Sequence, residues 1–349
     1  MKRKILHILY SGLGGTTDYV INLIKGDKNF EYEHHIIFYG IETIPENQLI
    51  LAKELSASVQ FVLKKKGYDY LAFKTVFSLI TSISPHIITL HVNSLILTCA
   101  KYKKAKLVFI EHQSNELKTK KEWLWSLIAQ LKADHIVSFT EDYLKILKKR
   151  LSIGFSKNKN LIINTGIELS LYSSQKAIED STIKVGIISR INNYRDHKTL
   201  LKAFIELNIT NSELYIAGDG PLKNQLQSKY NKRNIHWLGI VGSNDIITLL
   251  SKLDIYVIAS FGESTSIALM QAQASGLPII ASNVKGINNV LNHDNCIFVT
   301  PKNIQSYKTA LQILTTNKAH RDILSEKSSQ FANDNLSHFR MFEEYKRIL

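Results

Sequence analysis

The feature that most constrains this chain is a repeated alternation of short apolar runs with longer segments of helical spacing. Runs of four to seven residues rich in β-branched side chains recur along the whole sequence. Such runs predict strands buried on both faces of a sheet. They lie at residues 4–10, 34–39, 59–63, 86–91, 106–112, 135–139 and 160–164, and then at 183–189, 213–218, 235–239, 254–260, 278–282 and 296–299.

Two series of this kind predict two doubly wound, Rossmann-like α/β domains, and 349 residues are too many for one ordinary core. We expect the first domain to span 1–168 and the second 169–332, with a C-terminal helix at about 333–349 packing back on the first. Ligands of open parallel sheets bind beyond the carboxyl ends of the strands. The expected site is therefore a cleft between the two domains.

The net charge is +14, and residues 1–170 hold 24 Lys and Arg against 15 Asp and Glu. Such an excess attracts polyanions, either nucleic acid or an anionic membrane surface. A solvated surface is the simpler interpretation of any single lysine run. No nucleic-acid recognition module is present in the sequence, so nucleic acid is not an expected partner.

The chain shows no apolar run of the roughly 18 residues that span a bilayer. Its basic start, MKRKILHILYSG, has a short apolar part and no cleavage site, which indicates a first strand rather than a signal peptide. Cys99 and Cys296 lie far apart in apolar settings without metal-ligand spacing. A cytoplasmic protein is expected.

The loop after the first run, 10-YSGLGGTTDYVINLIK-25, brings glycines to the start of a predicted helix. A helix N-terminus offers free N–H groups to an anion. The dinucleotide pattern would need glycine at position 17, which is Thr17, so a nicotinamide site is not expected. A phosphate or sugar beside Gly14 and Gly15 and a simple tight turn are equally good accounts.

Three residues at other strand ends have side chains suited to a phosphorylated sugar. His112 follows the fifth run and can contact a hydroxyl or transfer a proton. Arg190 and Arg195 bracket the loop after residues 183–189, where two guanidiniums suit a diphosphate. The alternatives are a structural histidine and two surface arginines.

The segment 261-FGESTSIALMQAQASGLPIIAS-282 places Glu263 before a helix expected at about 266–275. Ser264, Thr265 and Ser266 are natural N-caps for this helix. Gln271 lies one and a half turns inside it. The local alternatives are capping by Glu263 and an ordinary polar position for Gln271.

Taken in order, these motifs resemble the retaining glycosyltransferases of family four, which have the GT-B fold. The Arg190–Arg195 loop comes first. The motifs that follow it are DHKTLLKAF (196–204), GDGP (218–221), HWLG (236–239), Glu263 with AQASGLP (272–278), and PIIAS (278–282). The first half matches more loosely, through Gly14 and Gly15, His112 and 164-NTGIE-168.

The resemblance implies an enzyme that moves a sugar from a nucleotide sugar, a UDP-sugar first and a GDP-sugar second, without a metal or cofactor. The catalytic set that it implies is Arg190, Arg195, Glu263 and His112. The substrate-binding set is Gly14, Gly15, Gly218, Ser264, Thr265, Ser266, Ile267 and Gln271.

Three positions depart from the family pattern. Arg195 stands where lysine is usual, Gln271 where a ribose-binding glutamate is usual, and Ser264 where glycine is usual. An amide lacks the charge-assisted pair of hydrogen bonds that a carboxylate makes. We therefore expect weaker nucleotide affinity rather than loss of activity.

The acceptor that the resemblance favours is a polyprenyl- or lipid-linked glycan, in the synthesis of capsule, O-antigen or exopolysaccharide. Lysines precede Trp123 and Trp125 in 116-ELKTKKEWLWSLIAQLKA-133, a pattern that suits peripheral binding to the inner face of an anionic cytoplasmic membrane. Packing of both rings into the core is an equal alternative. Rival functions are a sugar-nucleotide epimerase or hydrolase of the same fold, and a non-catalytic binding subunit.

Overall fold

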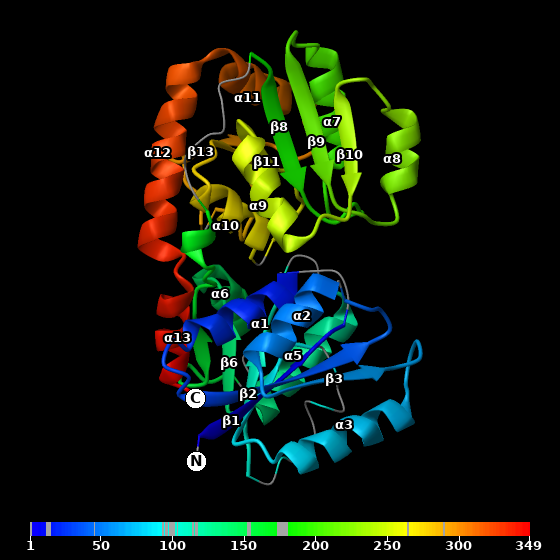
Figure 1. The fold of residues 1–349 in the computed structure, drawn as a ribbon, viewed down its shortest axis with the longest axis vertical. Helices are drawn as coiled ribbons and strands as arrows, with labels where there is room; N and C mark the ends of the chain where they lie inside the picture. The colour runs from blue at the N-terminus through cyan, green and yellow to red at the C-terminus, as the bar shows by residue number, and fades with distance from the viewer. Residues whose placement is uncertain are drawn as a thin grey trace. The chain divides into compact units, whose positions relative to one another are not determined.

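The structure is a computed structural model that describes residues 2–11, 15–44, 46–92, 94, 97, 102, 104–113, 115, 118–151, 155–172, 181–263, 265–288 and 290–349. The chain divides into two compact units. One consists of Met1–Ile167 with Ser337–Leu349, and the other of Glu168–Leu336. Each unit is built around one parallel sheet (Figure 1).

The described strands of the first unit form a seven-stranded sheet in the order β3-β2-β1-β4-β5-β6-β7. All of its neighbouring strands pair in parallel. This order, with the first strand inside the sheet, is that of a doubly wound fold. The strands are β1 (Arg3–Leu9), β2 (Tyr32–Gly40), β3 (Ser58–Leu63), β4 (Ile87–Leu90), β5 (Lys106–Ile110), β6 (His135–Ser138) and β7 (Asn160–Ile162).

Helices cover both faces of this sheet (Figure 1). Alternate residues of each strand point to opposite faces, so the buried apolar side chains divide into two clusters. One cluster packs under α1 and α13, and the other under α3 and α5. The helices are α1 (Gly15–Gly26), α2 (Glu46–Leu55), α3 (Tyr70–Ile83), α5 (Lys120–Lys132), α6 (Glu141–Arg150) and α13 (His338–Lys346).

The C-terminal helix α13 belongs to the first unit, where it packs against α1. Gly26 permits this approach, since a Cβ there would lie 2.6 Å from both the His338 carbonyl oxygen and Phe342 Cβ. A backbone bridge joins Ile167 to Ser337 where the chain leaves the first unit and where it returns. The sequence-based boundaries, after residue 168 and at about 333, differ from these by one and about four residues.

The described strands of the second unit form a six-stranded parallel sheet in the order β10-β9-β8-β11-β12-β13. Its strands are β8 (Ile183–Ile188), β9 (Ser212–Ala217), β10 (Ile235–Gly239), β11 (Ile255–Ile258), β12 (Ile279–Ser282) and β13 (Cys296–Val299). Its helices are η2 (Leu169–Leu171, a 3-10 turn), α7 (His197–Leu207), α8 (Lys223–Lys229), α9 (Ser243–Lys252), α10 (Ile267–Ala274), α11 (Ile304–Thr316) and α12 (Lys318–Asn335).

The predicted fold class is confirmed, because each of the thirteen apolar runs overlaps one of these strands, and the strands form two parallel sheets. None of the helices in the described ranges combines the length and the apolar character needed to cross a bilayer.

Candidate functional site

Two of the predicted catalytic residues form an ion pair at the carboxyl ends of the neighbouring strands β8 and β11. Arg195 lies between β8 and α7, and Glu263 lies between β11 and α10. The Arg195 Nη1 group donates to Glu263 Oε1 and, at 2.7 Å, to the hydroxyl of Ser260. The Arg195 side chain is 22% exposed and that of Glu263 is 9% exposed.

The pair holds opposite charges in a largely buried position. Burial raises the pKa of the Glu263 carboxyl, whereas the charge and hydrogen bond of Arg195 act to lower it. Within the described part of the chain, the Arg195 side chain donates its hydrogen bonds from Nη1. A guanidinium has further N–H donors at Nε and Nη2, which are suited to an anionic ligand.

Backbone hydrogen bonds fix the two loops that carry this pair. The Asp196 amide donates to the Ala259 carbonyl at 3.0 Å, and the Phe261 amide donates to the Tyr194 carbonyl at 3.1 Å. These contacts form an antiparallel bridge between Arg195 and the segment after β11. The cation and the carboxylate are therefore held by main chain as well as by their own attraction.

Gly286 packs closely against the backbone of Glu263. A Cβ at Gly286 would lie 1.8 Å from the Glu263 carbonyl oxygen, and the glycine adopts φ = +88°, a conformation that other residues rarely adopt. The Glu263 amide also donates to the Lys285 carbonyl at 3.4 Å. Gly286 was not predicted from the sequence, where its only signal is a glycine shortly after a buried strand.

The loops that carry the predicted site residues Arg190 and Gly218 are joined through backbone contacts of the neighbouring residues. A Cβ at Gly218, which has φ = +132°, would lie 2.0 Å from the Ser189 carbonyl oxygen. The Ile191 amide donates to the Asp219 carbonyl at 2.9 Å. The Arg190 side chain is exposed. The G-D-G-P turn thus packs directly on the loop that bears Arg190.

Two further polar residues order the start of α7 beside Arg195. The carboxylate of Asp196 accepts hydrogen bonds from the Thr199 hydroxyl at 2.6 Å and from the Lys302 amide at 2.7 Å. His197 Nε2 lies 3.1 Å from the Ser189 hydroxyl. Burial, reinforced by the charge of Arg195, lowers the pKa of His197 to about 3. These residues lie in the motif DHKTLLKAF, but the sequence indicated no role for them.

Helix α10 begins after Ser266, whose hydroxyl accepts from the Leu269 amide at 3.3 Å. Thr265 lies just before this cap and Ile267 is the first helical residue, whereas the predicted residue Ser264 lies outside the described residues. Gln271 is the fifth residue of α10 and is buried. Among the described residues, none makes a hydrogen bond to its carboxamide.

In the first unit, Gly15 begins α1, while Gly14 lies outside the described residues. His112 follows β5, as predicted, and its Nε2 lies 2.9 Å from Nδ1 of His91. Burial lowers the pKa of His112 to about 4. A neutral imidazole at this strand end can offer one donor and one acceptor nitrogen.

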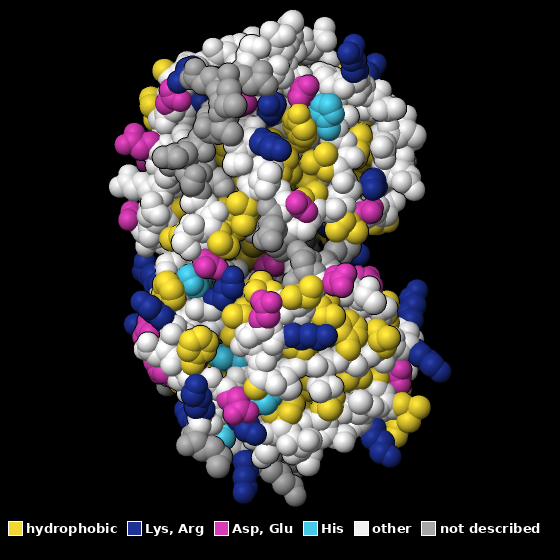
Figure 2. Space-filling view, viewed as in Figure 1, with side chains coloured by type: hydrophobic (Ala, Val, Ile, Leu, Met, Phe, Trp, Pro, Cys, Tyr) yellow, Lys and Arg dark blue, Asp and Glu magenta, His cyan; other side chains and the backbone are white. Residues whose placement is uncertain are grey.

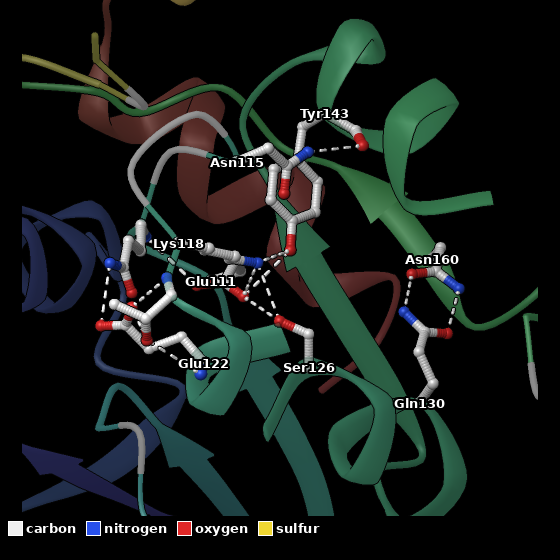
Figure 3. Close-up of polar contacts among 10 residues, drawn as sticks. Glu111, Asn115, Lys118, Glu122, Ser126, Gln130, Tyr143 and Asn160 are labelled. Carbon is white, nitrogen blue, oxygen red and sulfur yellow. Dashed lines mark hydrogen bonds and ion pairs between the residues drawn. The ribbon is translucent and has the colours of Figure 1, made fainter. Parts of the chain in front are cut away.

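Next to His112, a buried ion pair fixes the segment after β5 (Figure 3). Lys118 Nζ donates to the Glu111 carboxylate at 2.7 Å, and both side chains are almost fully buried. Ser126 and Tyr143 also donate to this carboxylate, at 3.1 and 2.9 Å. The network satisfies the buried charge and connects β5, α5 and α6, which gives Glu111 a structural rather than a catalytic setting.

The two tryptophans of α5 are partly exposed, and neither belongs to the described apolar clusters of this unit. Cations lie over both rings: Lys118 and Arg150 over Trp123, and Lys121 over Trp125. Figure 2 shows Lys and Arg side chains (dark blue) spread over the visible face of this unit rather than gathered in one patch.

The second unit is similar in sequence to a known family of proteins. Residues 171–331 match the sequence profile described as "Glycosyl transferases group 1". A 154-residue alignment, covering 42% of this chain, is 32% identical to an Escherichia coli protein named UDP-Gal:alpha-D-GlcNAc-diphosphoundecaprenol alpha-1,3-galactosyltransferase. The chain spans only 38% of that relative's length.

Two other relatives match along nearly the whole chain. An uncharacterized 41.2 kDa protein in the cps region of Klebsiella pneumoniae is 20% identical over 99% of both chains. The crystal structure of Anabaena Alr3699/HepE in complex with UDP and glucose superposes with a TM-score of 0.83 at 15% identity, covering 99% of this chain and 98% of that one. Residues 171–331 are thus similar in sequence to group 1 glycosyl transferases, and the chain has the two-sheet fold of the GT-B glycosyltransferases.

Proposed function

We propose that this chain transfers a sugar from a nucleotide sugar to a glycan acceptor, with retention of configuration and without a metal ion. The observation that carries the proposal is the Arg195–Glu263 pair at the carboxyl ends of β8 and β11, inside the segment that matches group 1 glycosyl transferases. The proposed donor is a UDP-sugar, with a GDP-sugar as the second choice. It is supported by one relative named for UDP-Gal and another crystallised with UDP.

Each group has a role that follows from its chemistry. Arg190 and the remaining N–H donors of Arg195 stabilise the negative charge that develops on the departing nucleoside diphosphate. Glu263 orients Arg195 and accepts hydrogen bonds from donor-sugar hydroxyls. Backbone N–H groups at the start of α10 bind an anionic part of the donor. The nucleotide sugar is a substrate, and no separate cofactor is proposed.

His112 is proposed to contact a sugar hydroxyl, and Gln271 to accept a hydrogen bond from the ribose. Neutral amide oxygens make weaker hydrogen bonds than carboxylates do. We therefore expect modest affinity for the donor.

The proposed acceptor is a polyprenyl- or lipid-linked glycan used for a surface polysaccharide. The name of the E. coli relative includes diphosphoundecaprenol, and the Klebsiella relative is named for a cps region. The partly exposed tryptophans of α5, with Lys121 over Trp125, are suited to a peripheral membrane contact. Trp125→Ala should then weaken sedimentation with anionic vesicles at low salt, and equal sedimentation of variant and wild type would reject this contact.

The central test is a thermal-shift screen of the purified chain against UDP-, GDP- and ADP-sugars, followed by product analysis with and without acceptor. A ligand of the native state raises the melting temperature by mass action. Stabilisation by none of these donors would count against the proposal. A free sugar or an epimerised nucleotide sugar formed without acceptor would favour the hydrolase or epimerase alternative.

The matched variants are Arg195→Ala and Arg233→Ala. Arg233 is exposed and lies just before β10, at the amino ends of the strands. Loss of turnover in Arg195→Ala alone would support the assignment. Donor binding without turnover in the wild-type chain would favour a non-catalytic binding subunit.

A further inference from the structure

A continuous line of hydrogen bonds crosses one face of the first sheet. It begins at Asp27, just after α1, and ends at His112, just after β5. The links pass through His34 on β2, His7 on β1, Thr89 on β4 and His91 just after β4. Their lengths, in that order, are 3.3, 2.9, 2.7, 3.1 and 2.9 Å.

The strand order explains how residues so distant in sequence form one line. Strands β2, β1, β4 and β5 are successive neighbours in the sheet. His7 is paired in register with Thr89. The members of the line point to the same face of the sheet as Ile5, Ile36, Ile87 and Val108, because they lie an even number of positions apart along their strands. These four apolar residues lie in the cluster under α1 and α13. The polar line therefore runs through the interior of an apolar layer.

The direction of each hydrogen bond in the line follows from the Asp27 carboxylate at its start. The Asp27 carboxylate only accepts, so His34 Nε2 must donate to it. A neutral His34 imidazole carries one N–H, and its Nδ1 then accepts from His7 Nε2. His7 Nδ1 then accepts from the Thr89 hydroxyl.

The Thr89 oxygen in turn accepts from His91 Nε2, and His91 Nδ1 accepts from His112 Nε2. His112 is thereby left with its proton on Nε2. Its Nδ1 has the chemistry of a hydrogen-bond acceptor. The charge on Asp27 thus determines the tautomer of the histidine at the far end.

Burial favours the neutral form of the His7 and His91 rings, and hydrogen bonds favour the charged form of Asp27. Burial lowers the pKa of His7 and of His91 well below the usual value. Burial acts to raise the pKa of Asp27, but hydrogen bonds from His34 and from the Tyr32 and Glu31 amides bring it below its usual value. Among the described residues, no group of three or more His, Cys, Asp or Glu could hold a metal ion, so hydrogen bonding accounts for this line.

Aromatic rings hold the line in place. Tyr19, on α1, packs edge-on against His91 and His112, and its hydroxyl bonds to that of Tyr345 on α13. His91 and His112 stack with their ring centroids 5.2 Å apart. The rings of His91 and His112 therefore have little freedom to turn away from their hydrogen-bond partners.

We propose that the line from Asp27 through His34, His7, Thr89 and His91 is a positioning device that fixes His112 in its Nε2–H tautomer. In this tautomer Nδ1 is the hydrogen-bond acceptor of the ring. The functional part rests on the proposed sugar transfer, whereas the tautomer itself does not. The other tautomer would present an N–H donor on that side of the ring and weaken acceptance from a hydroxyl.

The direct test is long-range ¹H–¹⁵N NMR of the imidazole groups in the full-length chain, which distinguishes protonated from unprotonated ring nitrogens. His112 is assigned by the signals lost in His112→Gln. We expect a protonated Nε2 and an unprotonated Nδ1 at neutral pH. A protonated Nδ1, or an averaged mixture of tautomers, overturns the proposal without any measurement of activity.

The matched variants are Thr89→Val, which removes the central hydroxyl, and Thr89→Ser, which keeps it. In folded Thr89→Val the His91 and His112 signals should move toward a mixture of tautomers, and Thr89→Ser should retain the wild-type pattern. Unchanged His112 signals in folded Thr89→Val overturn the proposal. If Thr89→Val does not fold, the wild-type spectrum still decides.

The functional readout is kcat/KM for sugar transfer, which should fall about two- to tenfold in Thr89→Val and recover in Thr89→Ser. His35→Gln is the control, because His35 bonds to Ser58 and Glu33 outside this line. It should leave the His112 signals unchanged. Absence of transfer by the wild-type chain would reject the proposed function and leave the tautomer result standing.

Discussion

Arg195 and Glu263 share one hydrogen-bonded ion pair although 68 residues separate them in the sequence. The same guanidinium nitrogen also binds Ser260, in the segment that leads to Glu263. Because both side chains are largely buried, neither can be replaced without changing the electrostatic surroundings of the other. Their contributions to folding and to donor binding are therefore coupled.

This coupling predicts a non-additive double-mutant cycle. Arg195→Ala leaves the Glu263 carboxylate buried without its cation, which should lower the free energy of unfolding by about 3 kcal/mol. Adding Glu263→Gln removes the uncompensated charge, so the double variant should be more stable than Arg195→Ala alone. Urea denaturation of the purified chain at neutral pH measures all four members of the cycle.

The control is Arg233→Ala, which removes the same charge from an exposed position. Its free energy of unfolding should stay within about 0.5 kcal/mol of the wild type. If the double variant loses the sum of the two single losses, the ion pair does not couple the two loops.

The close contact between Gly286 and the Glu263 carbonyl oxygen predicts that Gly286→Ala destabilises the fold far more than an ordinary glycine replacement does. The added Cβ would collide with the Glu263 carbonyl oxygen, and the positive φ adds strain. Gly67 is the matched control, since it has φ = +89° and nothing within 4 Å of a built Cβ. Gly67→Ala should cost about 1 kcal/mol of unfolding free energy through φ alone.

Gly286→Ala should cost several times as much and should also weaken donor binding, because Glu263 must shift. Chemical denaturation and donor titration of the two variants provide the comparison. Equal losses of unfolding free energy in Gly286→Ala and Gly67→Ala would mean that the Glu263 loop moves to accommodate the new methyl group without cost.

The sequence was sufficient to predict the two sheets. Continuous apolar runs such as residues 86–91 and 278–282 are typical of parallel strands that are buried on both faces. It also placed Arg195 in the loop after one predicted strand and Glu263 in the loop that leads into a predicted helix. Their pairing with each other could not be predicted, because it depends on how two loops cross. The main-chain bridge between Arg195 and Ser260 decides that crossing.

The histidine line was not predicted for a related reason. His7, His34 and Thr89 are polar residues within otherwise apolar strands, which indicates a buried partner but does not name it. Naming the partner requires the order of β2, β1 and β4 and the register that sets His7 opposite Thr89. The residues that support Glu263, such as Gly286, likewise depend on contacts between segments remote in sequence.

Buried neutral histidines predict loss of stability in acid. The pKa of His197 is about 3 when folded, against an ordinary value of about 6.5 when unfolded. Between these values the unfolded chain binds the extra proton, so the free energy of unfolding falls as pH falls. The loss from one such site is about 1.4 kcal/mol per pH unit in that window.

His197→Gln should therefore flatten the dependence of unfolding free energy on pH between about pH 6 and pH 4 by roughly that slope. His293→Gln, at an exposed position, is the control and should leave the slope as in the wild type. Urea denaturation at several pH values measures the slopes. Identical slopes for His197→Gln and the wild type would show that His197 does not resist protonation.

Gln271→Glu restores the glutamate that the family pattern usually has at the proposed ribose-binding position. Gln271 is buried in α10, so a carboxylate there loses hydration, and the free chain should become less stable by about 1–2 kcal/mol. If the side chain faces the ribose, the carboxylate recovers this loss through two charge-assisted hydrogen bonds when the donor binds. The donor should then raise the melting temperature of Gln271→Glu more than that of the wild type.

Gln273→Glu is the matched control, two residues further along the same helix and fully buried without a hydrogen-bond partner for its carboxamide among the described residues. Two residues turn a helix by about 200°, so position 273 faces away from position 271. It should lose stability without gaining any response to the donor. A donor response that is no larger in Gln271→Glu than in the wild type would mean that the ribose is held by another group.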